Sequence, residues 1–273
     1  MVDNRTGGDR RPSRERGGDG PRGPQHRGRR PEGPSSRSAG DRRPQPRNGA
    51  NDEAKGPPIP PEIEAKQLAP EIRRELSTLD KANADAVARH LVAAGTLLDE
   101  DPEAALSHAR AARARSGRIA AVREAVGIAA YQCGDWSQAI AELRAARRMG
   151  SKSPLLPLIA DCERGLGRPE RALELARGDE ASKLTGDEAD EMRIVIAGAR
   201  TDLGQLEQAL TVLSTPQLDP ARTGTISARL FYAYAEVLLA LDRKDEALQW
   251  FLHAAEADID GATDAEDRVS ELG

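Results

Sequence analysis

Four histidines and two cysteines are the residues of this 273-residue chain that best suit acid–base, nucleophilic or metal chemistry. The histidines are His26, His90, His108 and His253. None has a serine or cysteine nucleophile in the same segment in a triad-like order, although side chains distant in sequence can still meet in space. Cys133 and Cys162 form no CxxC motif and have no histidine pair nearby, so neither a disulfide framework nor a zinc site is indicated. We expect both to be small buried hydrophobic residues.

The acidic stretches also lack the spacing of a site. The sequence DIDG at 258–261 resembles a calcium loop, but its glycine comes fourth instead of sixth and no bidentate glutamate follows at the required place, so we expect a helix end and a turn. The clusters EDPE, DEADE and DAED suit solvated helix starts. No phosphate-binding glycine loop is present, because GLGRPE lies between two helix-like runs. The sequence therefore predicts no enzyme activity, no cofactor and no metal site.

The elements that would position any site are helices. From about residue 57 the chain is rich in Ala, Leu, Glu and Arg, which are strong helix formers, and no segment alternates as a strand would. Gly, Asp and Pro interrupt these runs at short intervals. We therefore expect an all-α domain over residues 57–273, with helices of roughly 10–18 residues joined by tight turns.

The interruptions repeat. Five stretches join two helix-like runs: EDPEAAL (100–106), GDWSQAI (134–140), GRPERAL (167–173), GQLEQAL (204–210) and DRKDEAL (242–248). Their alanines, at 105, 139, 172, 209 and 247, are spaced by 34, 33, 37 and 38 residues. A near-constant period of this size indicates stacked helix–turn–helix units. The two longer spacings predict longer loops near Ser214–Thr223 and Gly178–Asp187.

On these residues the chain resembles the tetratricopeptide repeat (TPR) family over about residues 84–257. The matching positions are Val126-Gly127, Ala139, Leu143 and Ala146 in the second repeat, and Tyr234-Ala235, Ala247, Phe251 and Ala254 in the fifth. The first, third and fourth repeats keep mainly the alanine, and the family's repeat-end proline is mostly absent. The stretches REAVGIAAYQCGDW and ADCERGLGRPERAL also resemble actinobacterial TPR proteins of unassigned function. The resemblance implies a right-handed α-solenoid of about five TPR-like repeats.

Packing explains the tryptophan of GDWSQAI and both ends of the repeat array. A small residue at Ala139 lets two helices approach closely, and we expect Trp136 to cover the end of the helix pair and touch the next repeat. Thr263–Glu266 has the pattern of a capping box that opens a polar helix to about Leu272. This helix, and a helix over Pro70–Leu79 at the front, would cap the exposed ends of the array.

The resemblance also implies a concave face, lined by the first helix of each repeat, that binds a protein or peptide partner. By position its lining includes His90, Glu124, Tyr131, Asp161, Arg164, Glu191, Tyr232 and Glu236. For any single residue the alternative is a solvated helix position. The Lys and Asn set with which the family clamps a peptide's carboxylate is missing. The four acidic residues and two tyrosines of the set favour a partner with basic and apolar character.

Residues 1–56 form a separate region, for which we expect a disordered Arg/Gly/Pro-rich arm. Its net charge is +6 against −11 for the remainder, and Val2 is its one large aliphatic residue. The charged start is followed by no apolar run, so we expect no signal peptide, no membrane segment and a cytoplasmic location. We predict a non-enzymatic interaction scaffold; the alternative is RNA or other nucleic-acid binding through the arm. The arm could also fold back on the acidic body or act as a solubilising tail, and the partner and oligomeric state stay open.

Overall fold

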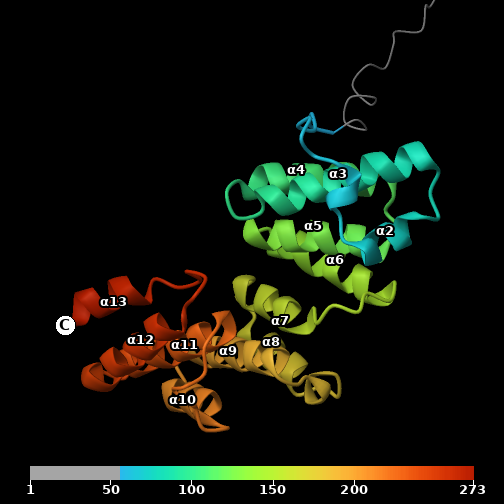
Figure 1. The fold of residues 1–273 in the computed structure, drawn as a ribbon. Coiled ribbons are helices and arrows are strands. Elements are labelled where there is room, and N and C mark those ends of the chain that lie inside the picture. Colours follow the sequence, from blue (N-terminus) through green and yellow to red (C-terminus); the bar gives the residue numbers. More distant parts are fainter. Residues whose placement is uncertain (1–55) are drawn as a thin grey trace, which may run out of the picture. The chain divides into compact units, whose positions relative to one another are not determined.

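A computed structural model describes residues 56–273, so the predicted arm falls outside the described residues. Within this range the chain folds into twelve α-helices and two short 3-10 helices, η1 and η2, with no strand (Figure 1). None of these helices combines the length and apolar character needed to cross a membrane. The elements are η1 (Ala65–Gln67), α2 (Pro70–Leu76), α3 (Lys81–Leu97), α4 (Pro102–Arg115), α5 (Ala120–Gln132), α6 (Trp136–Arg148), α7 (Leu156–Gly165), α8 (Pro169–Ala176), η2 (Ala181–Lys183), α9 (Asp187–Asp202), α10 (Leu206–Ser214), α11 (Thr225–Ala240), α12 (Lys244–Ala257) and α13 (Ala265–Leu272).

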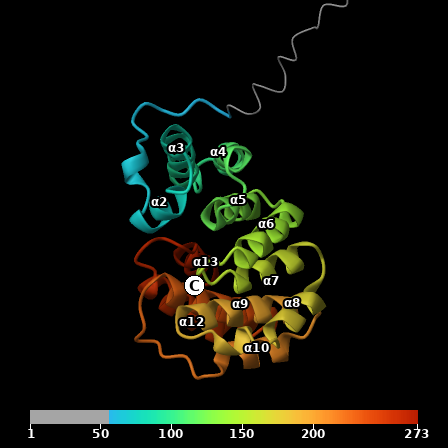
Figure 2. The same cartoon turned by 90° about the vertical axis from the view of Figure 1, so that its right-hand side faces the viewer.

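The helices pack in sequential pairs. The pairs are α3 with α4, α5 with α6, α7 with α8, α9 with α10, and α11 with α12, and each pair also contacts the next one along the chain (Figures 1 and 2). The five stretches predicted to join two helices each connect the members of one pair. The predicted all-α class and its helical pairs are therefore confirmed. The two predicted long loops are present between α8 and α9, where η2 lies, and between α10 and α11.

Four of the five joints share one backbone geometry. The first residue of the motif has a positive φ in Gly134, Gly167, Gly204 and Asp242, between 60° and 71°. At the first of these, the amide of Asp135 donates to the carbonyl of Ala130 at 2.9 Å, and the amide of Gly134 donates to Tyr131. These two bonds are the Schellman pattern, which satisfies the last carbonyls of a helix. The same long bond recurs at the other three joints, at 2.8–3.0 Å.

The alanine of each motif is buried within its helix pair. Ala105, Ala139, Ala172, Ala209 and Ala247 are all between 0 and 1% exposed. In the second pair, Gly127 of α5 lies against Leu143 of α6, since a Cβ added to the glycine would fall 2.6 Å from the leucine side chain. The expectation that small residues permit this close approach is confirmed at this pair.

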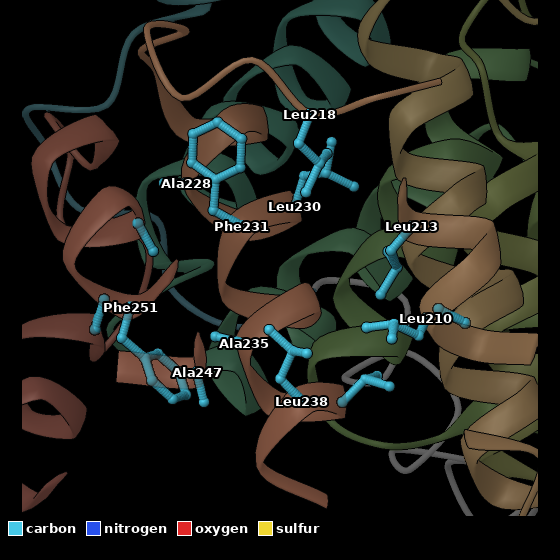
Figure 3. Packing of buried hydrophobic residues seen from close by; sticks show 14 of the residues in the cluster. Leu210, Leu213, Leu218, Ala228, Leu230, Phe231, Ala235, Leu238, Ala247 and Phe251 are labelled. Atoms are coloured by element: carbon cyan, nitrogen blue, oxygen red, sulfur yellow. The ribbon is translucent and has the colours of Figure 1, made fainter. Parts of the chain in front are cut away.

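The hydrophobic core is divided along the chain instead of gathered at one centre. Four clusters of buried residues follow one another from Leu68, just before α2, to α13. The last cluster, drawn in Figure 3, contains Phe231 and Leu238 of α11 together with Phe251 and Ala247 of α12. Each cluster joins neighbouring pairs only, as expected when each unit contacts its immediate neighbours.

Trp136 packs where the sequence predicts. It opens α6, is half-buried, and lies so close to Gly165 at the end of α7 that a Cβ on that glycine would fall 2.6 Å from the indole. The ring of Tyr131 meets it edge-on, with 5.2 Å between ring centroids. The tryptophan therefore connects two successive helix pairs.

The two ends differ in how well they match their predictions. The front helix, α2, packs on α3 and α5 but ends at Leu76, three residues earlier than expected. The last helix, α13, packs on α12 and runs to Leu272 as predicted. The predicted capping box at its start is wrong, because the N-cap is Asp264, whose side chain makes no capping bond to the helix, and the Thr263 hydroxyl donates to Asp258 at 2.7 Å. Asp258 itself ends α12 and organises the turn, as expected for that stretch.

Two glycine substitutions should change stability in opposite directions. Gly134→Ala should lower the free energy of unfolding by about 1–2 kcal/mol, because its φ of 71° is strained for any residue with a Cβ. Gly95→Ala should raise it by about 0.5–1 kcal/mol, because Gly95 lies within α3 and an added Cβ meets no atom within 4 Å. Urea unfolding of both variants checks the signs; equal effects would contradict the turn geometry.

The small side chain at the helix contact can be tested on one helix. Ala139→Leu should destabilise the protein by about 1–3 kcal/mol through overpacking against α5. Ala141→Leu adds the same atoms to an exposed position of α6 and should change stability by less than about 0.5 kcal/mol. Urea unfolding checks this: at equal m-values, the midpoint of Ala139→Leu should be lower than that of Ala141→Leu, and equal midpoints would contradict the prediction.

Candidate functional site

The residues predicted to bind a partner lie on the first helices of the pairs. His90 is in α3, Glu124 and Tyr131 are in α5, Asp161 and Arg164 are in α7, Glu191 is in α9, and Tyr232 and Glu236 are in α11. All eight are bonded to, or lie beside, a polar residue of another helix or connecting segment. We call the connected set from α5 to α13 the first-helix row. It consists of Tyr131, Asp161, Arg164, Glu191, Asp202, Arg229, Tyr232, Glu236 and Arg268.

At α5, α7 and α9 the row is continuous. The Tyr131 hydroxyl donates to Asp161 Oδ2, and Arg164 Nη1 lies 2.7 Å from Asp161 Oδ1. Arg164 Nε then reaches Asp202 Oδ2 at the end of α9, at 2.8 Å. Burial, followed by the charge of Asp161, raises the pKa of Tyr131 well above its usual value. Tyr131 is therefore a protonated donor at neutral pH, and these bonds connect three helix pairs.

Two further ion pairs continue the row to the last helix. Glu191 of α9 pairs with Arg229 of α11, and Glu236 of α11 accepts from Arg268 of α13 at 2.9 Å. Burial raises the pKa of Glu191, although the charge of Arg229 lowers it in part. Tyr232 lies beside Asp264; burial, then the hydrogen bond to that carboxylate, raises its pKa.

Glu124 has a local role in this structure. Its two carboxylate oxygens accept hydrogen bonds from the hydroxyls of Ser151 and Ser153, at 2.7 and 2.6 Å. Both serines belong to the segment between α6 and α7. Glu124 therefore ties that segment to α5, and its oxygens are already occupied by donors of this chain.

His90 departs from the expected exposed lining. Its side chain is 1% exposed, and its Nδ1 lies 3.0 Å from Nδ1 of His108 in α4, itself 4% exposed. One ring must donate and the other accept in this contact. The prediction that His90 is exposed is wrong, because it faces its own partner helix. The sequence places both histidines in the first helix pair, but nothing in their spacing of 18 residues predicts the contact.

Three buried carboxylates also went unpredicted. Glu142, Glu163 and Asp190 are at most 7% exposed, and each lies between two arginines. The pairs are Glu142 with Arg113 and Arg123, Glu163 with Arg144 and Arg168, and Asp190 with Arg193 and Arg222. Asp190 belongs to the DEADE cluster, so its expected solvation is wrong. Removing one partner of such a group leaves a buried charge, which is strongly destabilising.

Cavities accompany the first-helix row. One of about 500 Å³ is lined by Trp136, Asp161, Arg164 and Asp202, with part of the α7–α8 turn. Another of about 460 Å³ is lined by Ile194, Arg229, Tyr232 and the segment before α13. A smaller apolar cavity lies between α3 and α5. A further cavity of about 680 Å³ lies elsewhere, between α6, α7 and α8.

The large cavity beside α8 is lined by charges that mostly pair with one another. Arg144 binds Glu163 at 2.8 Å, and Arg171 binds Glu174 at 2.6 Å. The second oxygen of Glu163 has no hydrogen-bond donor within the described residues, and Arg168 lies 3.7 Å away. An exposed arginine at this distance can close the contact by a side-chain rotation, so this cavity singles out no ligand.

Nucleophile and metal chemistry find little support within residues 56–273. Cys162 is buried, and burial raises the pKa of its thiol to about 12, so it is a thiol at neutral pH. It packs as the expected small hydrophobic residue, whereas Cys133 is only partly buried. In this range no three His, Cys, Asp or Glu side chains gather as metal ligands would.

Comparison with known proteins adds no family. The chain matches no protein-family model, and a search of curated proteins finds no significant match.

The buried histidine pair should make the first helix pair sensitive to acid. Burial lowers the pKa of His108 below 6.5, so the unfolded chain binds its proton at a higher pH than the folded chain. Stability should therefore be complete above pH 6.5 and fall as the pH drops from 6.5 towards 5. Thermal unfolding of wild type and His108→Gln across pH 7 to 5 checks this, since the variant should show a flatter profile. His253→Gln in α12 retains the pair and should keep the wild-type slope; a loss of slope there would contradict the assignment.

Proposed function

We propose that this chain is a non-enzymatic interaction scaffold of the TPR type, which binds a peptide segment of a partner protein along the first helices of its pairs. In this proposal the pairs from α3–α4 to α11–α12 are five TPR-like units, and α2 and α13 cap them. The sequential pairing, the buried alanine of every joint and the shared turn geometry support this interpretation.

One observation carries the proposal: cavities along the first helices are lined by side chains that take part in ion pairs between helices. The hollows beside Asp202 and beside Tyr232 each exceed 400 Å³, and inter-helix bonds hold Arg164 and Asp202 in the first and Arg229 in the second. Side chains held in this way lose little freedom when a ligand binds, which favours affinity. A peptide in an extended form can place successive side chains in successive hollows.

The lining defines the character of the partner. The carboxylates along the first helices are those of Asp161, Asp202, Glu191 and Glu236, and the aromatic surface comes from Tyr232 and Trp136. Arg164, Arg229 and Arg268 are each bonded to at least one of these carboxylates. Negative charge is nevertheless in excess in the hollow beside Asp202, where Asp161, Glu170 and Asp202 face the single cation Arg164. A basic peptide with apolar residues fits this surface.

The competing function is nucleic-acid binding through the arm. It rests on thirteen arginines within residues 1–56. Phosphate binding would make the affinity fall steeply with salt, and truncation of the arm would abolish that dependence.

A random peptide library, displayed on phage and selected on the nuclease-treated full chain, tests the scaffold. Selected peptides should be rich in Lys and Arg next to apolar residues. Their affinity should fall about fivefold or more in the Asp202→Asn, Tyr232→Ser double variant, which removes one charge and one aromatic contact from the row. The double variant Glu207→Gln, Gln208→Ala changes exposed positions of α10, a second helix, and should bind as wild type. Failure to enrich any peptide, or equal binding by the row variant, would refute the proposal.

A further inference from the structure

A cavity of about 160 Å³ lies between α3 and α5, which are the first helices of the first and second pairs. All its lining residues are apolar. They include Leu91, Gly95 and Leu98 of α3, Ala125 and Ile128 of α5, and Ile72 of the front helix α2. An apolar cavity of about this size admits a group as large as a benzene ring. The volume therefore fits one leucine-sized side chain.

Small residues create this space. Half of the lining positions are Ala or Gly, including Ala94, Gly95, Ala121, Ala125 and Ala129. Gly95 is exposed, and a Cβ added there would meet no atom within 4 Å. Larger side chains could thus fill the hollow without a clash at the backbone. Apolar walls that lack partner atoms lose dispersion contacts, so an occupant would restore them.

The edge of the cavity is acidic. Asp99 and Glu100 directly follow the lining residue Leu98, and both are exposed. Within residues 56–273 neither has an ion pair within 4 Å, while the next residue, Asp101, caps α4. On the other side α2 carries two glutamates and two arginines, which balance. The uncompensated charge next to the cavity is therefore negative.

We propose that this cavity receives a leucine-sized apolar side chain of a partner peptide, with a Lys or Arg neighbour set against Asp99 and Glu100. The inference rests on the proposed scaffold function and names what its first two units recognise. The lining offers no polar atom to orient a small polar ligand. Residues 1–56 are a poor source, because Val2 is their one large aliphatic residue.

The apolar specificity can be measured with a positional-scanning library of octapeptides, each pool with one fixed residue, by fluorescence polarisation on the full chain. Pools with fixed Leu, Ile or Met should bind about tenfold or more tightly than the Ala pool, as burial of the larger side chain implies. Gly95→Leu, which fills the cavity from its own wall, should abolish that preference. Thr96→Leu adds the same side chain at the next, exposed position and should leave the preference intact.

The charged part has its own variant. Asp99→Asn with Glu100→Gln should reduce the preference for fixed Lys or Arg by about fivefold or more and flatten its dependence on salt. The matched pair Glu266→Gln with Asp267→Asn, exposed on α13, should change neither.

The possible results separate the inference from the scaffold function. Binding of peptides without an apolar preference, or an apolar preference that survives Gly95→Leu, overturns the cavity and leaves the scaffold standing. No binding by any pool overturns both. Sedimentation could show that the wild type is a dimer and that Gly95→Leu dissociates it. The occupant of the cavity would then be a second copy of the chain, and the inference of a partner peptide would be overturned. Intact stability of Gly95→Leu, measured by urea unfolding, confirms that lost binding is not lost folding.

Discussion

The structure depends on a small buried side chain at the joint of every helix pair. Ala139 and its four equivalents are at most 1% exposed, so a larger side chain at any of them would have to be accommodated within a packed interior. Each pair then contacts the next one along the chain, and the cavities and ion pairs lie along the first helices.

A second set of interactions acts between pairs. Tyr131, Asp161 and Arg164 connect α5, α7 and α9, and Arg229 and Arg268 extend the connection to α13. Sequence reasoning placed Tyr131, Asp161 and Arg164 on the first helices but treated them as free to meet a partner, and it did not identify Arg229 or Arg268. In the structure they mainly bind one another, so this polar surface is preformed and its charges are partly compensated within the chain.

The periodic features were predictable from the sequence and the long-range ones were not. The joints around Gly134 and Gly204, the class of fold and the packing of Trp136 follow from local spacing and from side-chain size. The burial of His90 and of Asp190 depends on His108 and Arg222, which lie 18 and 32 residues away. The predicted capping box failed for the same reason, since Asp258 of the preceding turn takes the Thr263 hydroxyl. Patterns within one helix cannot reveal a partner on another.

The division of the core into four successive clusters has a consequence for how the chain reaches this state. Each helix finds its partner a few tens of residues away, so the relative contact order is low and little loop entropy opposes each step. Helix pairs near the front can form while later ones are still being synthesised. A chain that ends after α6 already contains most of the residues in the cluster around Leu143. The cluster around Phe251, by contrast, is complete only when the last helices have been synthesised. The division of the core thus allows the helix pairs to assemble in the order of synthesis.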